Sequence, residues 1–260
     1  MPAGTPRQPI VVIPARMASS RLPGKPLADI GGLPMIVHVY RRAVEAAVGP
    51  VLVACAEAAI ADAVRKAGGE AVLTRPDHPS GSDRIFEAVQ RADPAGRHDA
   101  VVNLQGDLPT VEPQAIRAVL APLADPAVDI GTIVTLINSA EEHDNPNMVK
   151  AAVAFVEPQP GAPAVGRALY FSRLPVPAGE GPRYHHIGIY AFRRAALARF
   201  VTLPPGGLER RERLEQLRAL EAGMRIDAAL VDSAPFGVDT PADLARARAI
   251  LSPGMTLTPK

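Results

Sequence analysis

Four short apolar segments alternate with helix-forming segments in the first 104 residues, and this alternation restricts the fold more than any other feature. The predicted strands are residues 10–13, 51–54, 70–73 and 100–104. Helical spacing of apolar residues predicts helices at 34–47 and 57–67. Strands that are joined by helices in this order predict an α/β fold with a parallel sheet, because parallel neighbours need a crossover connection.

The later part of the chain follows a less regular pattern. Further strands are predicted at 130–137, at 149–156, at 184–192 and ending at Val231, and further helices at 83–91, at 113–123, at 209–222 and from Pro241 onward. Between residues 157 and 183, proline, glycine and short alternating apolar pieces interrupt the rhythm. This interruption predicts a smaller lobe or a contact between subunits.

The loop after the first predicted strand concentrates positive charge. Arg16, Arg21 and Lys25 lie within ten residues, among prolines that stiffen the backbone and beside Gly24. Open α/β sheets bind ligands beyond the carboxyl ends of their strands, so this loop is the leading candidate for an active site. Arginine forks suit the oxygens of a polyphosphate, although a solvated basic loop that binds nothing would have the same composition.

The polar loop at 74–84 follows another predicted strand and leads into a helix. Ser82 or Asp83 would serve as the N-cap of that helix. At a strand's carboxyl end, the same loop would also be placed to close over a base or a ribose.

Two aspartates complete the candidate site. Asp107 follows the strand at 100–104, and Asp239 precedes Thr240 and Pro241, a pair typical of a helix start. Taken alone, Asp107 would be interpreted as a turn residue, and Asp239 as a residue that helps to cap the helix. Together with a basic loop they become candidate Mg²⁺ ligands, since Mg²⁺ is commonly held by one or two carboxylates and substrate phosphates.

The charge balance and the single cysteine exclude several classes of protein. The 28 Lys and Arg residues nearly cancel the 27 Asp and Glu residues, so neither a nucleic-acid partner nor a membrane partner is expected. Cys55 is the one cysteine, which excludes an internal disulfide, and no secretion signal or long apolar run is visible. We therefore expect a soluble cytoplasmic protein. Neither a Walker loop nor a dinucleotide fingerprint is present.

Nine motifs in order along residues 10–250 carry a resemblance to a known family. They are IPAR (13–16), RLPGKPL (21–27), HPSGSDR (78–84), NLQGD (103–107), NPN (145–147), ALYFSR (168–173), HIGIY (186–190), LEQLR (214–218) and VDTP (238–241). With these motifs the sequence resembles the 3-deoxy-manno-octulosonate (KDO) cytidylyltransferases, a family of nucleotidyltransferase enzymes.

The resemblance implies an activity and a setting. The expected reaction moves CMP from CTP to the anomeric hydroxyl of KDO and releases pyrophosphate, with Mg²⁺ as cofactor. The product would supply lipopolysaccharide biosynthesis, and members of the family are typically cytoplasmic homodimers. CTP and KDO are the expected partners.

The resemblance also implies a three-layer αβα fold of the nucleotide-diphospho-sugar transferase type, with a Rossmann-like, mostly parallel mixed sheet and a small insertion lobe. The expected parts are a disordered tail at 1–9, a nucleotide-binding core at 10–156, a lobe with dimer contact and sugar-site strands at 157–192, the remaining core with the sugar and metal site at 193–251, and a tail at 252–260.

Site roles follow from the same resemblance, residue by residue. The expected catalytic residues are Arg16, Lys25, Asp107 and Asp239, of which the two aspartates would bind the metal. The backbone of Pro14 and Ala15 with Ser82 and Arg84 would frame the cytidine, and Arg21 is a further phosphate ligand. The residues expected around the sugar acid are Gln105, Arg173, His186, Tyr190, Glu215 and Gln216.

One departure from the family pattern lies beside a predicted metal ligand. Leu108 stands where the family has glutamate, which removes a charge next to Asp107. Two alternatives therefore stay open: cytidylyl transfer to another sugar acid, such as a sialic acid or an amino-substituted KDO, and a catalytically silent homologue that binds nucleotide or sugar.

Overall fold

The protein is described here by a computed structural model that covers residues 4–19, 21–155 and 163–251. The chain divides into two compact units. Unit 1 comprises residues 1–9, 98–102 and 114–234, and unit 2 comprises residues 10–97, 103–113 and 235–260. Both units alternate between strands and helices along the chain, so the predicted α/β class is confirmed.

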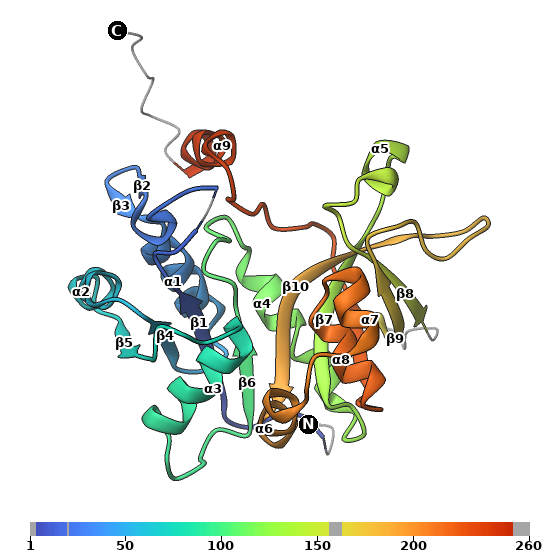
Figure 1. The fold of residues 1–260 in the computed structure, drawn as a ribbon, viewed down its shortest axis with the longest axis horizontal. Coiled ribbons are helices and arrows are strands. Elements are labelled where there is room, and N and C mark those ends of the chain that lie inside the picture. The colour runs from blue at the N-terminus through green and yellow to red at the C-terminus, as the bar shows by residue number, and fades with distance from the viewer. Residues whose placement is uncertain (1–3, 20, 156–162, 252–260) are drawn as a thin grey trace, which may run out of the picture. The chain divides into compact units, whose positions relative to one another are not determined.

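Unit 2 contains the parallel part of the fold (Figure 1). Its sheet has the strand order β5-β4-β1, and β1 pairs with β4, and β4 with β5, in parallel. The elements are β1 (Pro9–Ala15), β2 (Asp29–Ile30), β3 (Leu33–Pro34), α1 (Met35–Ala46), β4 (Val51–Cys55), α2 (Ala58–Lys66), β5 (Glu70–Leu73), α3 (Gly81–Ala92) and α9 (Pro241–Leu251), with a short 3₁₀ helix at Lys25–Leu27.

The parallel strands of unit 2 explain the unbroken apolar runs in the sequence. Val11, Val12 and Ile13 of β1 are fully buried, and β4 has only its first residue partly exposed. Strands of parallel sheets are covered on both faces, so they lack the polar alternation of a half-exposed strand. These positions therefore form the core beneath the loops at the strand ends.

Unit 1 contains a mixed sheet in which antiparallel pairs predominate. Its strand order is β6-β10-β7-β11-β9-β8, and only β11 with β7 is parallel among the pairs described within it. The elements are β6 (Ala100–Asn103), α4 (Pro113–Ala118), β7 (Ile130–Leu136), α5 (Ala140–Asp144), β8 (Lys150–Phe155), β9 (Val165–Ser172), β10 (Tyr184–Arg193), α6 (Arg194–Thr202), α7 (Gly207–Glu212), α8 (Gln216–Glu221) and β11 (Ile226–Leu230), with a 3₁₀ helix at Ala121–Ala124.

Two predicted helices are interrupted in the structure. The one predicted at 113–123 ends at Ala118 and resumes as the 3₁₀ turn, because Pro122 has no N–H and clashes with a helical carbonyl four residues earlier. The one predicted at 209–222 is broken at Arg213, whose backbone is left-handed with φ 55°. Hydrogen bonds of 2.6 and 2.8 Å between Arg218 and Glu209 join the two resulting helices.

Other differences concern helix starts and segments without a strong pattern. Helix α3 begins at Gly81 with Ser80 as its N-cap, and not with Ser82 or Asp83. The Ser80 hydroxyl oxygen accepts from the Asp83 N–H at 3.2 Å, so Asp83 lies inside the first turn. Helices α5 and α6 were not predicted.

The chain's ends lie only partly within the described residues. Residues 252–260 of the predicted tail, and residues 1–3, fall outside them. Arg7 and Gln8 donate backbone hydrogen bonds of 2.7 and 3.0 Å to the Asp99 carboxylate in unit 1. Among the residues that the structure describes, no helix combines the length and hydropathy that a bilayer-spanning segment needs.

Candidate active site in unit 2

The first loop leaves β1 at Ala15 and turns back toward the sheet at Gly24. Gly24 has φ 71°, a left-handed conformation that favours glycine, and its N–H donates to the Met17 carbonyl at 3.3 Å. The N–H of Met17 in turn donates to the Glu57 carboxylate at 3.1 Å, beyond the end of β4. This folding places the side chain of Lys25 against the end of the strand that carries Asp107.

Lys25 bridges the two predicted metal ligands. Its Nζ atom lies 2.7 Å from Asp107 Oδ2 and 3.0 Å from Asp239 Oδ1. The ammonium group is largely buried, with 16% of the side chain exposed. Burial by itself would lower the pKa of Lys25, but attraction to Asp107 and hydrogen bonds to both aspartates outweigh it and raise the pKa. Lys25 is therefore held firmly in its charged form.

The start of α9 determines where Asp239 points. Asp243 Oδ2 accepts from the backbone N–H groups of Asp239 and Thr240, and Thr240 Oγ1 accepts from the Asp243 N–H. Thr240 and Asp243 thus perform the capping, and the Asp239 carboxylate is left for cations. Besides Lys25, it pairs with Arg21 at 2.9 Å.

Close packing fixes the strand tip that carries Asp107. A Cβ atom on Gly106 would lie 2.8 Å from the Pro14 carbonyl oxygen, so only glycine permits this approach to the first loop. The Asp107 carbonyl accepts from the Val238 N–H at 2.9 Å, and buried Leu108 lies beside Gly237. Leu108 therefore joins the two aspartate-bearing segments through apolar contact.

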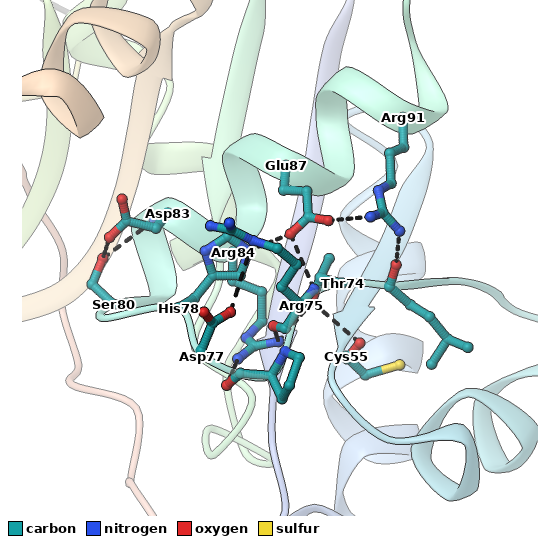
Figure 2. A network of polar contacts seen from close by, with 12 residues as sticks. Cys55, Thr74, Arg75, Asp77, His78, Ser80, Asp83, Arg84, Glu87 and Arg91 are labelled. Carbon is teal, nitrogen blue, oxygen red and sulfur yellow. Dashed lines mark hydrogen bonds and ion pairs between the residues drawn. The ribbon is translucent and has the colours of Figure 1, made fainter.

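The loop at 74–84 is fastened at both ends (Figure 2). Arg84 donates to Thr74 Oγ1 at 2.6 Å and to the Arg75 carbonyl at 3.0 Å, and the Thr74 hydroxyl donates to the Cys55 carbonyl at 3.2 Å. Burial lowers the pKa of Arg84, an effect that Glu57 opposes and Arg16 reinforces. Neighbouring oxygens thus hold the Arg84 guanidinium in place, and the positive charge of Arg16 acts on it.

Glu87, one turn further along α3, holds the same loop (Figure 2). Its carboxylate accepts from the Arg75 N–H at 3.1 Å and contacts His78 Nε2 and the Arg91 guanidinium. Burial would raise the pKa of Glu87, but the hydrogen bonds from His78 and Arg75 and the charge of Arg91 lower it. Glu87 therefore remains ionised and anchors His78.

These elements enclose a pocket of about 370 Å³, within the size range of small-ligand sites. Eight predicted site residues line it: Pro14, Ala15, Arg16, Arg21, Lys25, Arg84, Gln105 and Asp107. Asp239 adjoins them through Lys25 and Arg21. Ser82 is buried and is not among the lining residues; Ser80 and Gly81 take that place.

Sequence reasoning missed several contributors to this pocket. Ala18, Ser19, His78, Ser80 and Gly81 line it but were not assigned to the site. His78 and Ser80 stand inside a polar loop that was itself singled out, so the loop supplied a signal for them. Glu87 resembles an ordinary surface residue of a helix, and no local pattern identifies it.

The remaining predicted residues lie in unit 1, where backbone carbonyls hold Arg173. Arg173 donates from Nε to the Glu212 carbonyl at 2.9 Å and from its terminal nitrogens to the carbonyls of Pro146 and Arg213 at 3.2 and 3.4 Å. These bonds use three of the five N–H groups of the guanidinium. Among the described residues no other acceptor binds the guanidinium, which leaves two N–H groups for a ligand such as a carboxylate.

His186 and Tyr190 form an aromatic group on β10. Their ring centroids are 5.5 Å apart, and Phe171 meets His186 edge-on at 4.7 Å. Burial, with a small addition from His185, lowers the pKa of His186 to about 3, so the imidazole is neutral. Burial and then the Glu215 carboxylate raise the pKa of Tyr190. Neither side chain carries charge at neutral pH.

Gln216, a predicted contact of the sugar acid, is buried at the start of α8. It is 6% exposed, and its Nε2 has no hydrogen-bond partner among the described residues. A buried amide donor without a partner costs free energy. An acceptor on a bound ligand would relieve that cost.

The carboxylates in unit 2 suit a divalent cation that a substrate helps to hold. Oxygens of Asp107 and Asp239 converge on one cationic nitrogen, which is the arrangement a hard metal ion requires. Among the described residues, no group of three or more His, Cys, Asp and Glu side chains is placed to hold a metal. The donor set therefore fits Mg²⁺ with further ligands from phosphate or water.

Known proteins resemble this chain along most of its length. The family model described as cytidylyltransferase matches residues 10–226. A protein of Paramagnetospirillum magneticum named 3-deoxy-manno-octulosonate cytidylyltransferase is 67% identical over 243 residues, which cover 94% of this chain and 97% of that protein. A protein of Rhodospirillum centenum with the same name is 66% identical over 248 residues, which cover 95% of each chain.

A solved structure extends the likeness to three dimensions. The structure of CMP:2-keto-3-deoxy-manno-octonic acid synthetase complexed with CTP is 40% identical, with a TM-score of 0.85, and the match covers 96% of this chain and 100% of that one. A nucleotidyl transferase of Methanothermobacter thermautotroptrophicus, at 16% identity and a TM-score of 0.58, shares the fold. The chain therefore belongs to the cytidylyltransferase family and, within it, to the 3-deoxy-manno-octulosonate cytidylyltransferases.

Proposed function

We propose that this protein transfers CMP from CTP to the anomeric hydroxyl of KDO and releases pyrophosphate. The observation that carries the proposal is the bridge from Lys25 to Asp107 and Asp239, in a pocket lined also by Arg16, Arg21 and Arg84. Cations for a triphosphate and carboxylates for a metal lie together there. Relatives at 63–67% identity carry the name of this activity.

The cationic residues would hold the triphosphate. Arg16 and Lys25 bind phosphate oxygens and stabilise the pyrophosphate as it leaves, with Arg21 as a further ligand. The backbone of Pro14 and Ala15, together with Arg84, frames the cytidine. Because Ser82 is buried away from the pocket lining, its part is to shape the first turn of α3.

Asp107 and Asp239 are the residues that would hold Mg²⁺. Mg²⁺ held there would neutralise phosphate charge and lower the pKa of an attacking hydroxyl. The chain itself contributes the orientation of both carboxylates, through the Asp107 carbonyl bond to Val238 and the cap made by Thr240 and Asp243. Leu108 is buried beside Gly237, next to these supporting bonds.

The sugar acid would be recognised mainly by uncharged groups. Arg173 has two N–H groups left for its carboxylate, and Gln216 has an unpaired donor for a hydroxyl. Neutral His186 and Tyr190, together with Glu215 and Gln105, are the other proposed contacts. The neutral state of His186 suits hydroxyl recognition, which needs hydrogen bonds and not charge.

We further propose the setting that such a product implies: supply of KDO for lipopolysaccharide biosynthesis, in the cytoplasm, by a homodimer. Sedimentation of the purified protein tests the dimer.

The activity is tested by measuring pyrophosphate release with CTP and Mg²⁺ in three parallel reactions, with KDO, with a sialic acid and with no acceptor. We expect release with KDO alone. Release with the sialic acid instead would reassign the acceptor, and no release with any acceptor from a folded protein would favour the silent homologue. An amino-substituted KDO as a fourth acceptor separates the remaining alternative.

A further inference from the structure

The ion pairs in unit 2 already fill the places that a metal would take. Lys25 Nζ contacts one oxygen of Asp107 and one of Asp239, and Arg21 contacts the other Asp239 oxygen at 2.9 Å. Three of the four carboxylate oxygens therefore face a cationic side chain. A divalent ion that arrived alone would have to displace Lys25 or bind beside a positive charge.

The same two cations are proposed ligands of the nucleotide phosphates. A triphosphate offers several anionic oxygens at once, so it competes with Asp107 and Asp239 for Lys25 and Arg21. Once the cations turn to the phosphates, the carboxylates are left unpaired, and two neighbouring carboxylates without a cation repel each other. The free energy of that state favours a divalent ion.

The geometry allows such an exchange without refolding. Lys25 ends in a four-carbon stem with rotatable bonds, and Arg21 has 63% of its side chain exposed. Lys25 and Arg21 also line the pocket in which the phosphates would lie. The described residues supply no third acidic, histidine or cysteine ligand, so the metal site is incomplete until phosphate oxygens join it.

We infer that Lys25, assisted by Arg21, acts as a resident cation that keeps the two carboxylates occupied until nucleotide binds, so that metal and nucleotide binding are coupled. The inference rests on the proposed function for the identity of the nucleotide. Removing an active-site residue usually weakens ligand binding. Here we expect that removing Lys25 tightens the binding of the metal ion. By linkage, metal and nucleotide each raise the affinity for the other by the same factor.

The test measures Mn²⁺ binding by water proton relaxation, which separates protein-bound ion from ion bound to free nucleotide. Wild-type protein, Lys25→Met and Lys66→Met are titrated without nucleotide. Lys66 is an exposed residue of α2 and removes one charge of the same kind from unit 2. We expect Lys25→Met to bind Mn²⁺ at least about tenfold more tightly than wild type and Lys66→Met to match wild type, because nearby charges act far more strongly than distant ones.

A second set of titrations contains the α,β-methylene analogue of CTP, which cannot release pyrophosphate. The analogue should raise the Mn²⁺ affinity of wild type by a larger factor than that of Lys25→Met. Adding Asp107→Asn to Lys25→Met should abolish the gain, which locates the ion at the carboxylate pair.

Unchanged Mn²⁺ affinity in folded Lys25→Met would overturn the inference, and so would an equal gain in Lys66→Met or a gain that survives Asp107→Asn. The wild-type pyrophosphate assay reports separately on the proposed function. Activity with KDO together with no gain in Lys25→Met rejects the resident cation alone. Inactivity together with the predicted gain rejects the reaction and supports the resident cation.

Discussion

The candidate residues of unit 2 and those of unit 1 meet their surroundings in opposite ways. In unit 2, Arg21, Lys25, Asp107 and Asp239 satisfy one another through ion pairs at the wall of a pocket. In unit 1, Arg173 is held by backbone carbonyls, and His186 lies among aromatic rings. The first group can exchange its partners for a charged ligand, whereas the second is fixed by packing before any ligand arrives.

The two parts of the proposed reaction, phosphate chemistry and acceptor recognition, therefore need different kinds of side chain. Phosphate and metal charges need strong but exchangeable partners, because the charge is rearranged during the transfer. The hydroxyls of a sugar acid need donors and acceptors in fixed positions. Substitutions in unit 2 should therefore change chemistry and nucleotide affinity, and those in unit 1 should change acceptor affinity and stability.

The largest expected effect follows from Asp107→Asn. The amide keeps the shape but cannot neutralise a divalent ion, so pyrophosphate release should fall by about 10³-fold, or roughly 4 kcal/mol of activation free energy. The thermal midpoint should stay nearly unchanged, because Lys25 keeps its ion pair with Asp239. Asp62→Asn, an exposed carboxylate on α2, is the control. A large loss of midpoint with little loss of rate would make Asp107 a structural turn residue.

The second-largest expected effect is that of Arg173→Met, which tests the candidate residues of unit 1. Loss of the guanidinium should raise the KM for KDO by about 10²-fold, or roughly 2.7 kcal/mol, which is the range expected for a charge-assisted pair. The KM for CTP should stay within about twofold. Arg183→Met, which removes one exposed bond to the Gly179 carbonyl, is the matched control. Equal changes in both KM values would contradict a role confined to the acceptor.

The third expected effect is a loss of folding stability at acidic pH, caused by His186. The pKa is about 3 in the folded chain and near 6.5 when unfolded, so only the unfolded state takes up a proton as the pH falls below about 6.5. The folded protein should therefore lose stability between pH 6.5 and pH 5, by about 2 kcal/mol from this group. Urea unfolding of wild type and His186→Gln at both pH values measures it. An identical pH dependence in the two proteins would show that folding does not lower the pKa of His186.

The smallest expected effect is that of Glu87→Gln, which tests whether Glu87 holds the loop at 74–84 beside the unit 2 pocket. The amide can still accept from the Arg75 N–H but loses the charge that holds His78 and Arg91. The KM for CTP should rise about tenfold, or roughly 1.4 kcal/mol, with kcat nearly unchanged. Arg91→Gln, which removes only the outer ion pair, should change the KM by less. An unchanged KM in folded Glu87→Gln would show that the loop needs no such anchor.

The sequence predicted the parallel strands of unit 2 well, because continuous apolar runs reflect burial on both faces. Strand β5 has the predicted bounds, and β4 differs by one residue. The meeting of Asp107 with Asp239 was also anticipated, from the placement of loops at strand ends together with the family motifs. Both features depend on local pattern or on motifs that identify a family.

Features that depend on distant partners could not be predicted. The leucines at 214, 217 and 220 keep helical spacing after the break at Arg213, so periodicity alone reads 209–222 as one helix. Glu87 gains its role from residues nine and twelve positions earlier, which the fold of the loop brings back to α3. The N-cap at Ser80 was missed because three neighbouring polar residues offer the same chemistry.

The most direct test of the whole account is a phosphorus NMR spectrum of the protein incubated with CTP, KDO and Mg²⁺. We expect the three triphosphate signals to decline while a phosphodiester signal grows together with a pyrophosphate signal of twice its intensity, and only when KDO is present. A spectrum in which CTP persists, or in which CMP appears without the phosphodiester, would contradict it.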